Sequence, residues 1–381
     1  MSENILNYKD LPIDDLELED ITTLKFKSTY FYLEDAYKLY KSANNNHIAD
    51  YILRDENFKE KFFKISPEEL NFDNVNPVKI QELTVKSTLG NLSSPRIAFA
   101  NTEVKEENII RSMRGDANLD KERYRKLASI LKKARKENAD ILLFPECFIP
   151  LNLLSSLVKY AEKNQCLTIT GLEHLKLDKT AFNFIVTILP VEIDGIKDSI
   201  VVFRIKNHYS PGEEFLISKN HLSVPKPKPY RYDIFNWRNI YFSSFYCFEL
   251  ANSLHRSLFK GKIDLLVGVE WNRDTNYFSN IVEASSRDLH VFVAQVNTSQ
   301  YGDTRLTQPK DTNGKDLLKL KGGTNDAILI ANINIDKLRE FQRQKIITPE
   351  FIGDFKPLPP DFSHKDVIKR IKNKSILKNG K

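Results

Sequence analysis

A chain of 381 residues with 41% hydrophobic and 11% aromatic residues holds enough apolar material for one large domain with extensions, or for two domains. The net charge of +6 is small and concentrated late in the chain, so it does not by itself indicate a nucleic-acid-binding protein. The three cysteines form no CxxC pair, which indicates free thiols in a reducing compartment. We see no signal-peptide pattern at the start and no apolar run of the roughly 18 residues that a membrane span needs, so we expect a cytoplasmic protein.

Residues 1–93 differ in pattern from the rest of the chain and carry no catalytic motif. They begin with an acidic stretch, and residues 30–40 (YFYLEDAYKLY) show helical spacing. We predict a mostly helical N-terminal extension. It either packs on the main domain, which we favour modestly, or docks a partner protein.

From residue 94 to 345 strand and helix patterns alternate, as expected for one α/β domain. We predict strands at 96–104, 140–146, 166–171, 182–192, 198–206, 230–247, 263–271, 291–297 and 327–335, and helices at 120–138, 151–164, after 247, at 277–288 and at 336–344. Residues 108–116, 208–213 and 298–323 read as loops or turns. Because several strands are continuously apolar and others form hairpin-like pairs, we expect a mixed sheet covered by helices. Residues 346–381 read as a surface arm with a flexible, lysine-rich end, where nucleic-acid contact is the less favoured alternative to a solvated tail.

Three of the predicted strands end in residues that could cooperate chemically: Glu146, Lys206 and Cys247. Strand ends are where sites collect in sheets of this kind. Cys247 stands where an aromatic strand meets a helical pattern, and the positive end of that helix would favour the thiolate. A carboxylate can deprotonate a thiol and later return the proton to a leaving amine. An ammonium and a backbone N–H, for which we choose Phe248, can stabilise the oxyanion of a tetrahedral intermediate.

Three motifs in this order resemble the nitrilase, or carbon–nitrogen hydrolase, superfamily. Leu142–Glu146 (LLFPE) is similar to the strand that ends in the general base, and Lys206–Glu213 (KNHYSPGE) to the lysine motif. Cys247–Glu249 (CFE) is similar to the nucleophile motif, and 264–271 and 287–297 to the segments after it in that family. The resemblance covers residues 94–345. It implies a four-layer α-β-β-α sandwich, a Glu146–Lys206–Cys247 triad, no metal, no cofactor, and homo-oligomers. It also implies a small amide, carbamoyl compound or nitrile as substrate, with an amidase ranked above a true nitrilase because amides are the commoner substrates there.

Other positions have two interpretations. Glu213 either positions Lys206 as a second carboxylate or is a turn acid. Glu249 either lines the pocket or caps the helix after Cys247, which we favour. Trp271 and Asn272 either face the substrate or belong to the core. The arginine that usually precedes the lysine is Ile205 here, and this and similar departures leave the substrate class open.

Two other function classes compete with an enzyme: nucleic-acid binding by the basic tail, and an assembly or interaction module. The extension and the tail suit an assembly or interaction module, and residues 297–344 resemble nitrilase-like domains found alongside bacterial reverse transcriptases in antiphage defence. Such a role would need a polymerase partner, because no Tyr-x-Asp-Asp motif occurs here. The intact triad favours the enzyme. The seven histidines show no HxxxH or HExxH spacing, so we predict no metal site.

Overall fold

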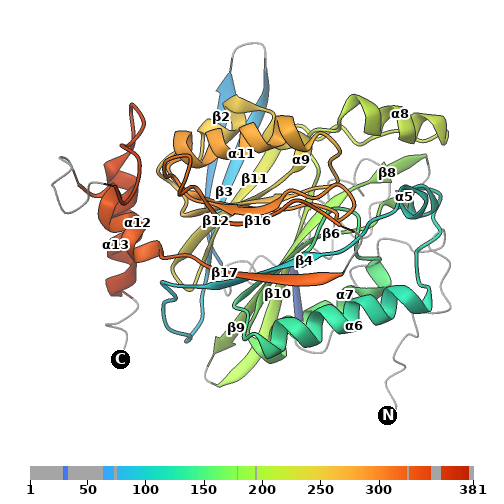
Figure 1. Ribbon diagram of the computed structural model, residues 1–381, viewed down its shortest axis with the longest axis horizontal. Coiled ribbons are helices and arrows are strands. Elements are labelled where there is room, and N and C mark those ends of the chain that lie inside the picture. The colour runs from blue at the N-terminus through green and yellow to red at the C-terminus, as the bar shows by residue number, and fades with distance from the viewer. Residues whose placement is uncertain are drawn as a thin grey trace.

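The computed structural model describes residues 29–32, 63–72, 75–177, 179–193, 195–323, 326–344 and 353–376. Most of their strands belong to two large sheets (Figure 1). In spatial order the first sheet contains β1 (Thr29–Tyr32), β10 (Ile196–Ile205), β9 (Phe184–Ile193), β6 (Leu167–Gly171), β5 (Ile141–Leu143), β4 (Arg96–Asn101) and β17 (Ala327–Asn332). The second contains β16 (Asp316–Leu320), β15 (Thr304–Thr307), β14 (Phe292–Val296), β13 (Leu265–Val269), β12 (Ile240–Tyr246), β11 (Tyr230–Trp237), β3 (Val75–Val85) and β2 (Phe63–Phe72). A short hairpin, β7 (Leu175–Leu177) and β8 (Thr180–Phe182), stands apart.

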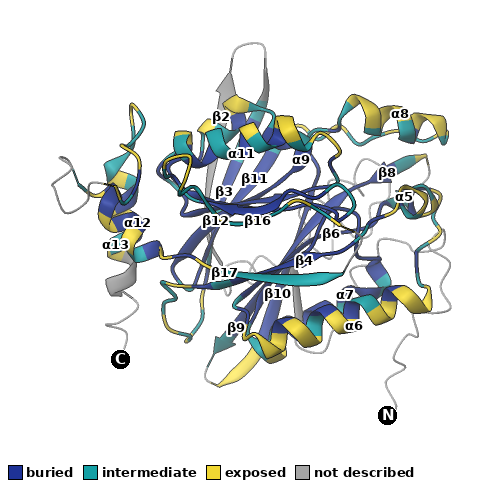
Figure 2. Cartoon of the chain, viewed as in Figure 1, coloured by how far each residue is buried: buried dark blue, intermediate teal, exposed yellow. Residues whose placement is uncertain are grey.

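The sheets face each other across one apolar core, and helices cover their outer faces. The helices are α5 (Glu106–Met113), α6 (Lys121–Lys136), α7 (Leu151–Asn164), α8 (Pro211–Lys219), α9 (Cys247–Leu250), α10 (Ser253–Ser257), α11 (Thr275–Leu289), α12 (Ile335–Gln342) and α13 (His364–Ile376). Helices α6 and α7 share a buried cluster with the first sheet, and α11 shares another with the second. Figures 1 and 2 show the sheets as the buried middle of the molecule, with α6 and α11 on opposite outer sides. The predicted four-layer α-β-β-α sandwich is therefore confirmed.

The continuous apolar runs arise because central strands are buried on both faces. In β4, Ile97 and Phe99 point into the core between the sheets, whereas Ala98 and Ala100 pack under the helices. Side chains alternate along a strand, so a strand covered on both sides needs apolar residues at every position. Helix α6 shows the matching helical pattern, and it begins at an Asp120 side chain that accepts a hydrogen bond from the Arg123 backbone N–H.

The predicted helical extension is wrong wherever the structure describes residues 1–93. Residues 63–72 and 75–85 form an antiparallel pair, and β3 then adds to the second sheet parallel to β11. Residues 29–32 form a strand parallel to β10 at the edge of the first sheet. Buried side chains explain β3, because Val78 and Ile80 join the core on one face while Leu83 and Val85 join the core on the other. The remaining residues of this segment lie outside the described ranges, and docking of a partner there stays a prediction.

Three segments predicted as loops or turns contain regular structure. Residues 106–113 are helix α5, whose buried side includes Ile109 and Met113. Residues 211–219 are helix α8, which begins with a Ser210 cap and a proline in its first turn. The long segment 298–323 contains β15 and β16, which extend the second sheet beyond β14. Such short elements are easily mistaken for loops in a sequence. The two helices have fewer than three turns and the two strands fewer than six residues, so their hydrophobic periodicity is weak.

The C-terminal arm ends in a helix that is fixed to the second sheet. Arg370 of α13 and Arg339 of α12 both form ion pairs with the buried Asp264 at the start of β13. Val367 of α13 is fully buried. Residues 365–376, predicted as part of a flexible tail, are therefore helical and docked, and the last five residues lie outside the described ranges.

This docking predicts a sharp difference between two truncations. A chain ending at Phe362 should lose about 3–5 kcal/mol of unfolding free energy, because it loses a buried charge-assisted hydrogen bond and a buried valine. A chain ending at Ile376 keeps both and should match the full chain. Urea denaturation measures both, and equal midpoints for the two truncations would contradict the docking.

Candidate active site

The ends of three strands bring Glu146, Lys206 and Cys247 into contact. Glu146 follows β5, Lys206 follows β10 and Cys247 follows β12, so two residues come from the first sheet and one from the second. The Lys206 Nζ donates to Glu146 Oε1 at 2.7 Å, and the Cys247 thiol donates to Glu146 Oε2 at 3.5 Å. All three side chains are buried. The carboxyl group of Glu146 thus lies between the thiol and the ammonium.

Two further donors fix the orientation of the Glu146 carboxyl group. Asn183 Nδ2 donates to Oε1 at 2.7 Å, and the backbone N–H of Trp271 donates to Oε2 at 3.2 Å. Asn183 lies between β8 and β9 and is fully buried. Sequence reasoning missed it, although a polar residue inside the apolar run Ala181–Phe184 was a signal that could have identified it.

Glu213 is the second carboxylate on Lys206, as one of its two interpretations proposed. Its Oε2 accepts from Lys206 Nζ at 2.5 Å, and its Oε1 lies 3.8 Å from His174 Nε2. Burial alone would raise the pKa of Glu213, but Lys206 and His174 outweigh it and lower the pKa to about 2. Burial alone would likewise lower the pKa of Lys206, but Glu146 and Glu213 hold it well above its ordinary value. Lys206 is therefore a permanent cation balanced by Glu213.

The pKa of the Cys247 thiol is shifted in the direction opposite to the one that the sequence predicted. We expected the helix end to favour a thiolate, but burial and the nearby Glu146 raise the pKa of Cys247 well above that of a free thiol. The helix that begins there, α9, is only four residues long and offers little dipole to oppose burial. Burial also raises the pKa of Glu146, with Lys206 opposing it. The raised pKa of Cys247 disfavours a thiolate, and Glu146 is the carboxyl group in contact with the thiol.

The raised pKa of Glu146 predicts the acid side of the pH–rate profile. A base acts only when it is deprotonated, so if Glu146 takes the thiol proton, kcat/KM should fall as the pH drops through the raised pKa of Glu146. The midpoint should lie above about pH 4.3, the ordinary value for a glutamic acid. Glu213 cannot cause this limb, because its pKa is about 2. A profile that stays flat down to pH values below about 4.3 would contradict the assignment of Glu146 as the base.

Glu249 caps the helix after Cys247, as favoured, and also joins the segments that carry Lys206 and Cys247. Its carboxylate accepts from the backbone N–H of Tyr246 at 2.9 Å and of Asn207 at 2.6 Å. Both of its oxygens also accept from Arg204, each at 2.8 Å. Arg204 stands two residues before Lys206, next to the position where Ile205 departs from the motif. The pair therefore connects the end of β10 with the end of β12.

A cavity of about 450 Å³ opens onto this constellation. The other predicted site residues, Phe248, Trp271 and Asn272, all line it. Trp271 is only partly available to a ligand, because its indole N–H donates to the Val104 carbonyl at 2.9 Å. Phe248 occupies the second position of α9, where a backbone N–H has no carbonyl acceptor within the helix.

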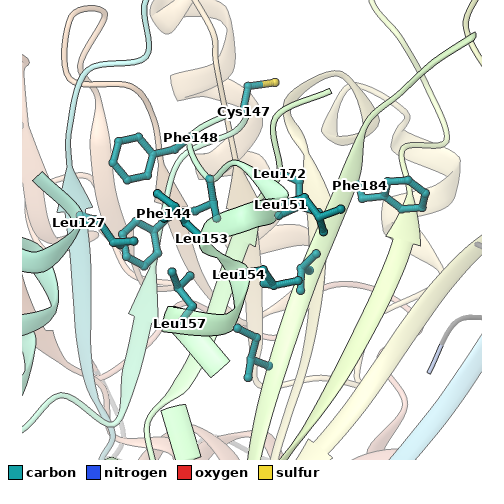
Figure 3. Packing of buried hydrophobic residues seen from close by; sticks show 14 of the residues in the cluster. Leu127, Phe144, Cys147, Phe148, Leu151, Leu153, Leu154, Leu157, Leu172 and Phe184 are labelled. Carbon is teal, nitrogen blue, oxygen red and sulfur yellow. The ribbon is translucent and has the colours of Figure 1, made fainter. Parts of the chain in front are cut away.

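Cys147 also lines the cavity. Its Sγ lies 3.7 Å from His174 Nδ1, and Figure 3 shows it at the edge of the apolar cluster with its sulfur directed away from Phe144 and Phe148. Its positive φ of 56° turns the chain directly after Glu146. Burial raises the pKa of Cys147 well above the ordinary value, and unlike Cys247 it has no contact with the Glu146 carboxyl group among the hydrogen bonds of the described residues. Cys247 is therefore the better-placed nucleophile.

Within the described ranges, no three His, Cys, Asp or Glu side chains are grouped so that they could hold a metal ion. The described helices are also all too short or too polar to cross a lipid bilayer.

The wall of the cavity carries three reactive groups: the thiol of Cys247, the carboxyl group of Glu146 and the ammonium of Lys206.

Comparisons with known proteins give structural likenesses only. No family model and no curated protein matches the sequence. The fold is similar to XC1258 from Xanthomonas campestris, described as a CN-hydrolase superfamily protein with an arsenic adduct in the active site. The identity is 12%, the TM-score 0.47, and the match covers 70% of this chain and 99% of that one. It is also similar to a mutant amidase from Nesterenkonia sp. AN1 in complex with butyramide, at 16% identity and a TM-score of 0.46, over 65% of this chain and 93% of that one. At this similarity the two solved structures add no residue roles.

Proposed function

We propose that this protein is a carbon–nitrogen hydrolase that cleaves a small non-peptide amide through a thioester on Cys247. One observation carries the proposal. In a single buried cavity, the carboxyl group of Glu146 contacts both the Cys247 thiol and the Lys206 ammonium. A thiol, a base that can reach it and a fixed cation are the groups that acyl transfer requires.

The steps follow from these contacts. Glu146 takes the thiol proton as Cys247 Sγ attacks the amide carbon, and the carbonyl oxygen becomes an oxyanion that Lys206 Nζ and the Phe248 N–H stabilise. The C–N bond then breaks, and Glu146 returns the proton to the departing amine. A water molecule, deprotonated by Glu146, attacks the thioester, and the acid leaves as the thiol is regenerated. Glu213 keeps Lys206 charged and in place throughout.

The cavity wall indicates the acyl part of the substrate. Phe215, Leu216, Phe248 and Phe278 contribute apolar surface to the lining, which also contains the charged residues Lys219, Arg273 and Asp274. The volume of the cavity, about 450 Å³, is at the small end of the range for ligand pockets, which is roughly 300–1,000 Å³. We therefore infer a small amide with an apolar acyl group, and we rank amides above nitriles on the superfamily resemblance.

The test is ammonia release from a panel of amides, carbamoyl compounds and nitriles. Wild type and Cys166→Ala should release ammonia, because Cys166 lies in the apolar core under the helices. Cys247→Ala should release none. Release that persists in a folded Cys247→Ala protein would reject the thioester mechanism. A folded wild type that releases nothing and shows no acyl adduct on Cys247 by intact mass in cell extract would favour the alternative, an assembly module with a partner such as a reverse transcriptase.

A further inference from the structure

The exposed positions of α6 hold six cations, Lys121, Arg125, Lys132, Lys133, Arg135 and Lys136, and one acid, Glu122. Lys121, Arg125, Lys132 and Lys136 follow one another at spacings of four, seven and four residues, which places them on one stripe of a helix. Arg135 and Tyr124 flank this stripe, and Ala128 and Ser129 occupy its middle. All of these side chains belong to exposed residues, and Figure 2 shows the exposed side of α6 directed away from the molecule. We call Lys121, Arg125, Lys132, Arg135 and Lys136 the α6 cationic face.

The exposed acids at the two ends of α6 pair with cations outside this face, and Lys126 is shared with Asp326. Glu122 pairs with Lys126 at 3.2 Å, and Glu137, just after the helix, pairs with Arg96 at 3.4 Å. Within the described part of the chain, the five cations of the face take part in no ion pair that would cancel their charge. An ordinary solvated surface mixes both signs of charge, whereas the exposed side of α6 carries cations in every turn and one acid, Glu122, in its first turn.

The length of the face suits a regularly charged polymer. From Lys121 to Lys136 the helix rises about 22 Å, which matches about six phosphate steps of one nucleic-acid strand. Tyr124, 38% exposed at the edge of the face, adds a surface on which an unpaired base could stack.

An anionic membrane fits less well. A helix that binds in the membrane interface buries an apolar side in the lipid. The apolar side of α6, with Leu127, Ile130 and Ala134, is buried against the first sheet. The helix therefore has no free apolar side that it could insert into a lipid bilayer.

We propose that the α6 cationic face binds the phosphate backbone of nucleic acid without base specificity. The site is separate from the catalytic cavity, since no residue of α6 lines it. The proposed interaction does not depend on the proposed hydrolase activity. It does not depend on the lysines at the end of the chain either, and every variant of the test keeps those lysines.

The test is fluorescence anisotropy of the full chain with a labelled duplex and a labelled single strand of about 20 nucleotides, roughly three times the length of the face. Between about 50 and 200 mM salt, the affinity for duplex should fall steeply. The triple variant Arg125→Gln/Lys132→Gln/Lys136→Gln keeps good helix formers at these exposed positions, so its fold should persist in thermal unfolding. It should bind duplex at least about tenfold more weakly at low salt, with the slope of log K against log salt reduced by about 2–3.

A matched control removes the same charge elsewhere. Lys179, Lys226 and Lys228 are exposed on loops outside α6, and their replacement by Gln should leave binding nearly unchanged. Tyr124→Ala should weaken binding to the single strand more than to the duplex. The proposal is overturned by absence of binding at low salt, by equal losses in the two triple variants, or by binding to vesicles of anionic phospholipid without binding to either oligonucleotide.

Discussion

Glu146→Gln is expected to lower kcat/KM for an amide substrate by about 10²–10⁴-fold while the protein stays folded. Glutamine retains an oxygen that can accept from Lys206 and fits the same volume, but it cannot accept the thiol proton or return it to the amine. Because the pKa of Cys247 is raised by burial, the thiol depends on that base. Alkylation of Cys247 by iodoacetamide should therefore slow along with turnover.

Glu173→Gln is the matched control for this experiment. Glu173 is also a buried carboxyl group, held by Asn118 and Arg123 outside the thiol–ammonium contact, and burial raises its pKa to about 7. Its replacement should leave the alkylation rate of Cys247 within a few-fold of wild type. If Glu146→Gln alkylates as fast as wild type, the carboxyl group does not act as the base for the thiol.

Arg204→Met is expected to reduce the free energy of unfolding by about 3–5 kcal/mol, because it leaves the Glu249 carboxylate buried without its cation. The Arg204 and Glu249 side chains are 3% and 0% exposed, so solvent cannot replace the lost partner. Activity should fall as well, since Glu249 holds the backbone directly before Cys247 and directly after Lys206.

A double-mutant cycle separates the charge pair from the packing. In Arg204→Met/Glu249→Gln no charge is left unpaired, and much of the lost stability should return. Guanidinium denaturation of wild type, both single variants and the double variant gives the coupling free energy. Additive losses would show that the two side chains act independently.

The site residues that follow the ends of strands could be predicted from the sequence alone. Glu146, Lys206 and Cys247 each end a recognisable apolar strand, and parallel or mixed sheets bring such ends together at one edge. Helix α7 was predicted with the bounds that the structure has, because its heptad-like apolar pattern runs for four turns between a proline and a left-handed Gln165.

The residues that escaped prediction depend on contacts between distant segments. Asn183 gains its meaning only from the Glu146 oxygen beside it, 37 positions earlier in the chain. The β3 strand is apolar on both faces, yet only the open edge of β11 makes it a strand of this sheet. Arg204 could not be distinguished from an ordinary surface arginine before its pairing with Glu249 was known, because the pair spans 45 positions.

Glu146 and Lys206 follow strands of the first sheet, and Cys247 follows a strand of the second. The rate of the proposed reaction should therefore be sensitive to residues far from the substrate. Side chains such as Phe99, Leu143, Phe242 and Val267 fill the space between the two sheets. A slide of one sheet over the other by an ångström would change the distance from the thiol to its base without breaking a hydrogen bond inside either sheet. The packing between the two sheets therefore sets the distance from the Cys247 thiol to the Glu146 carboxyl group. Substitutions that change side-chain volume there should alter turnover before they alter substrate affinity.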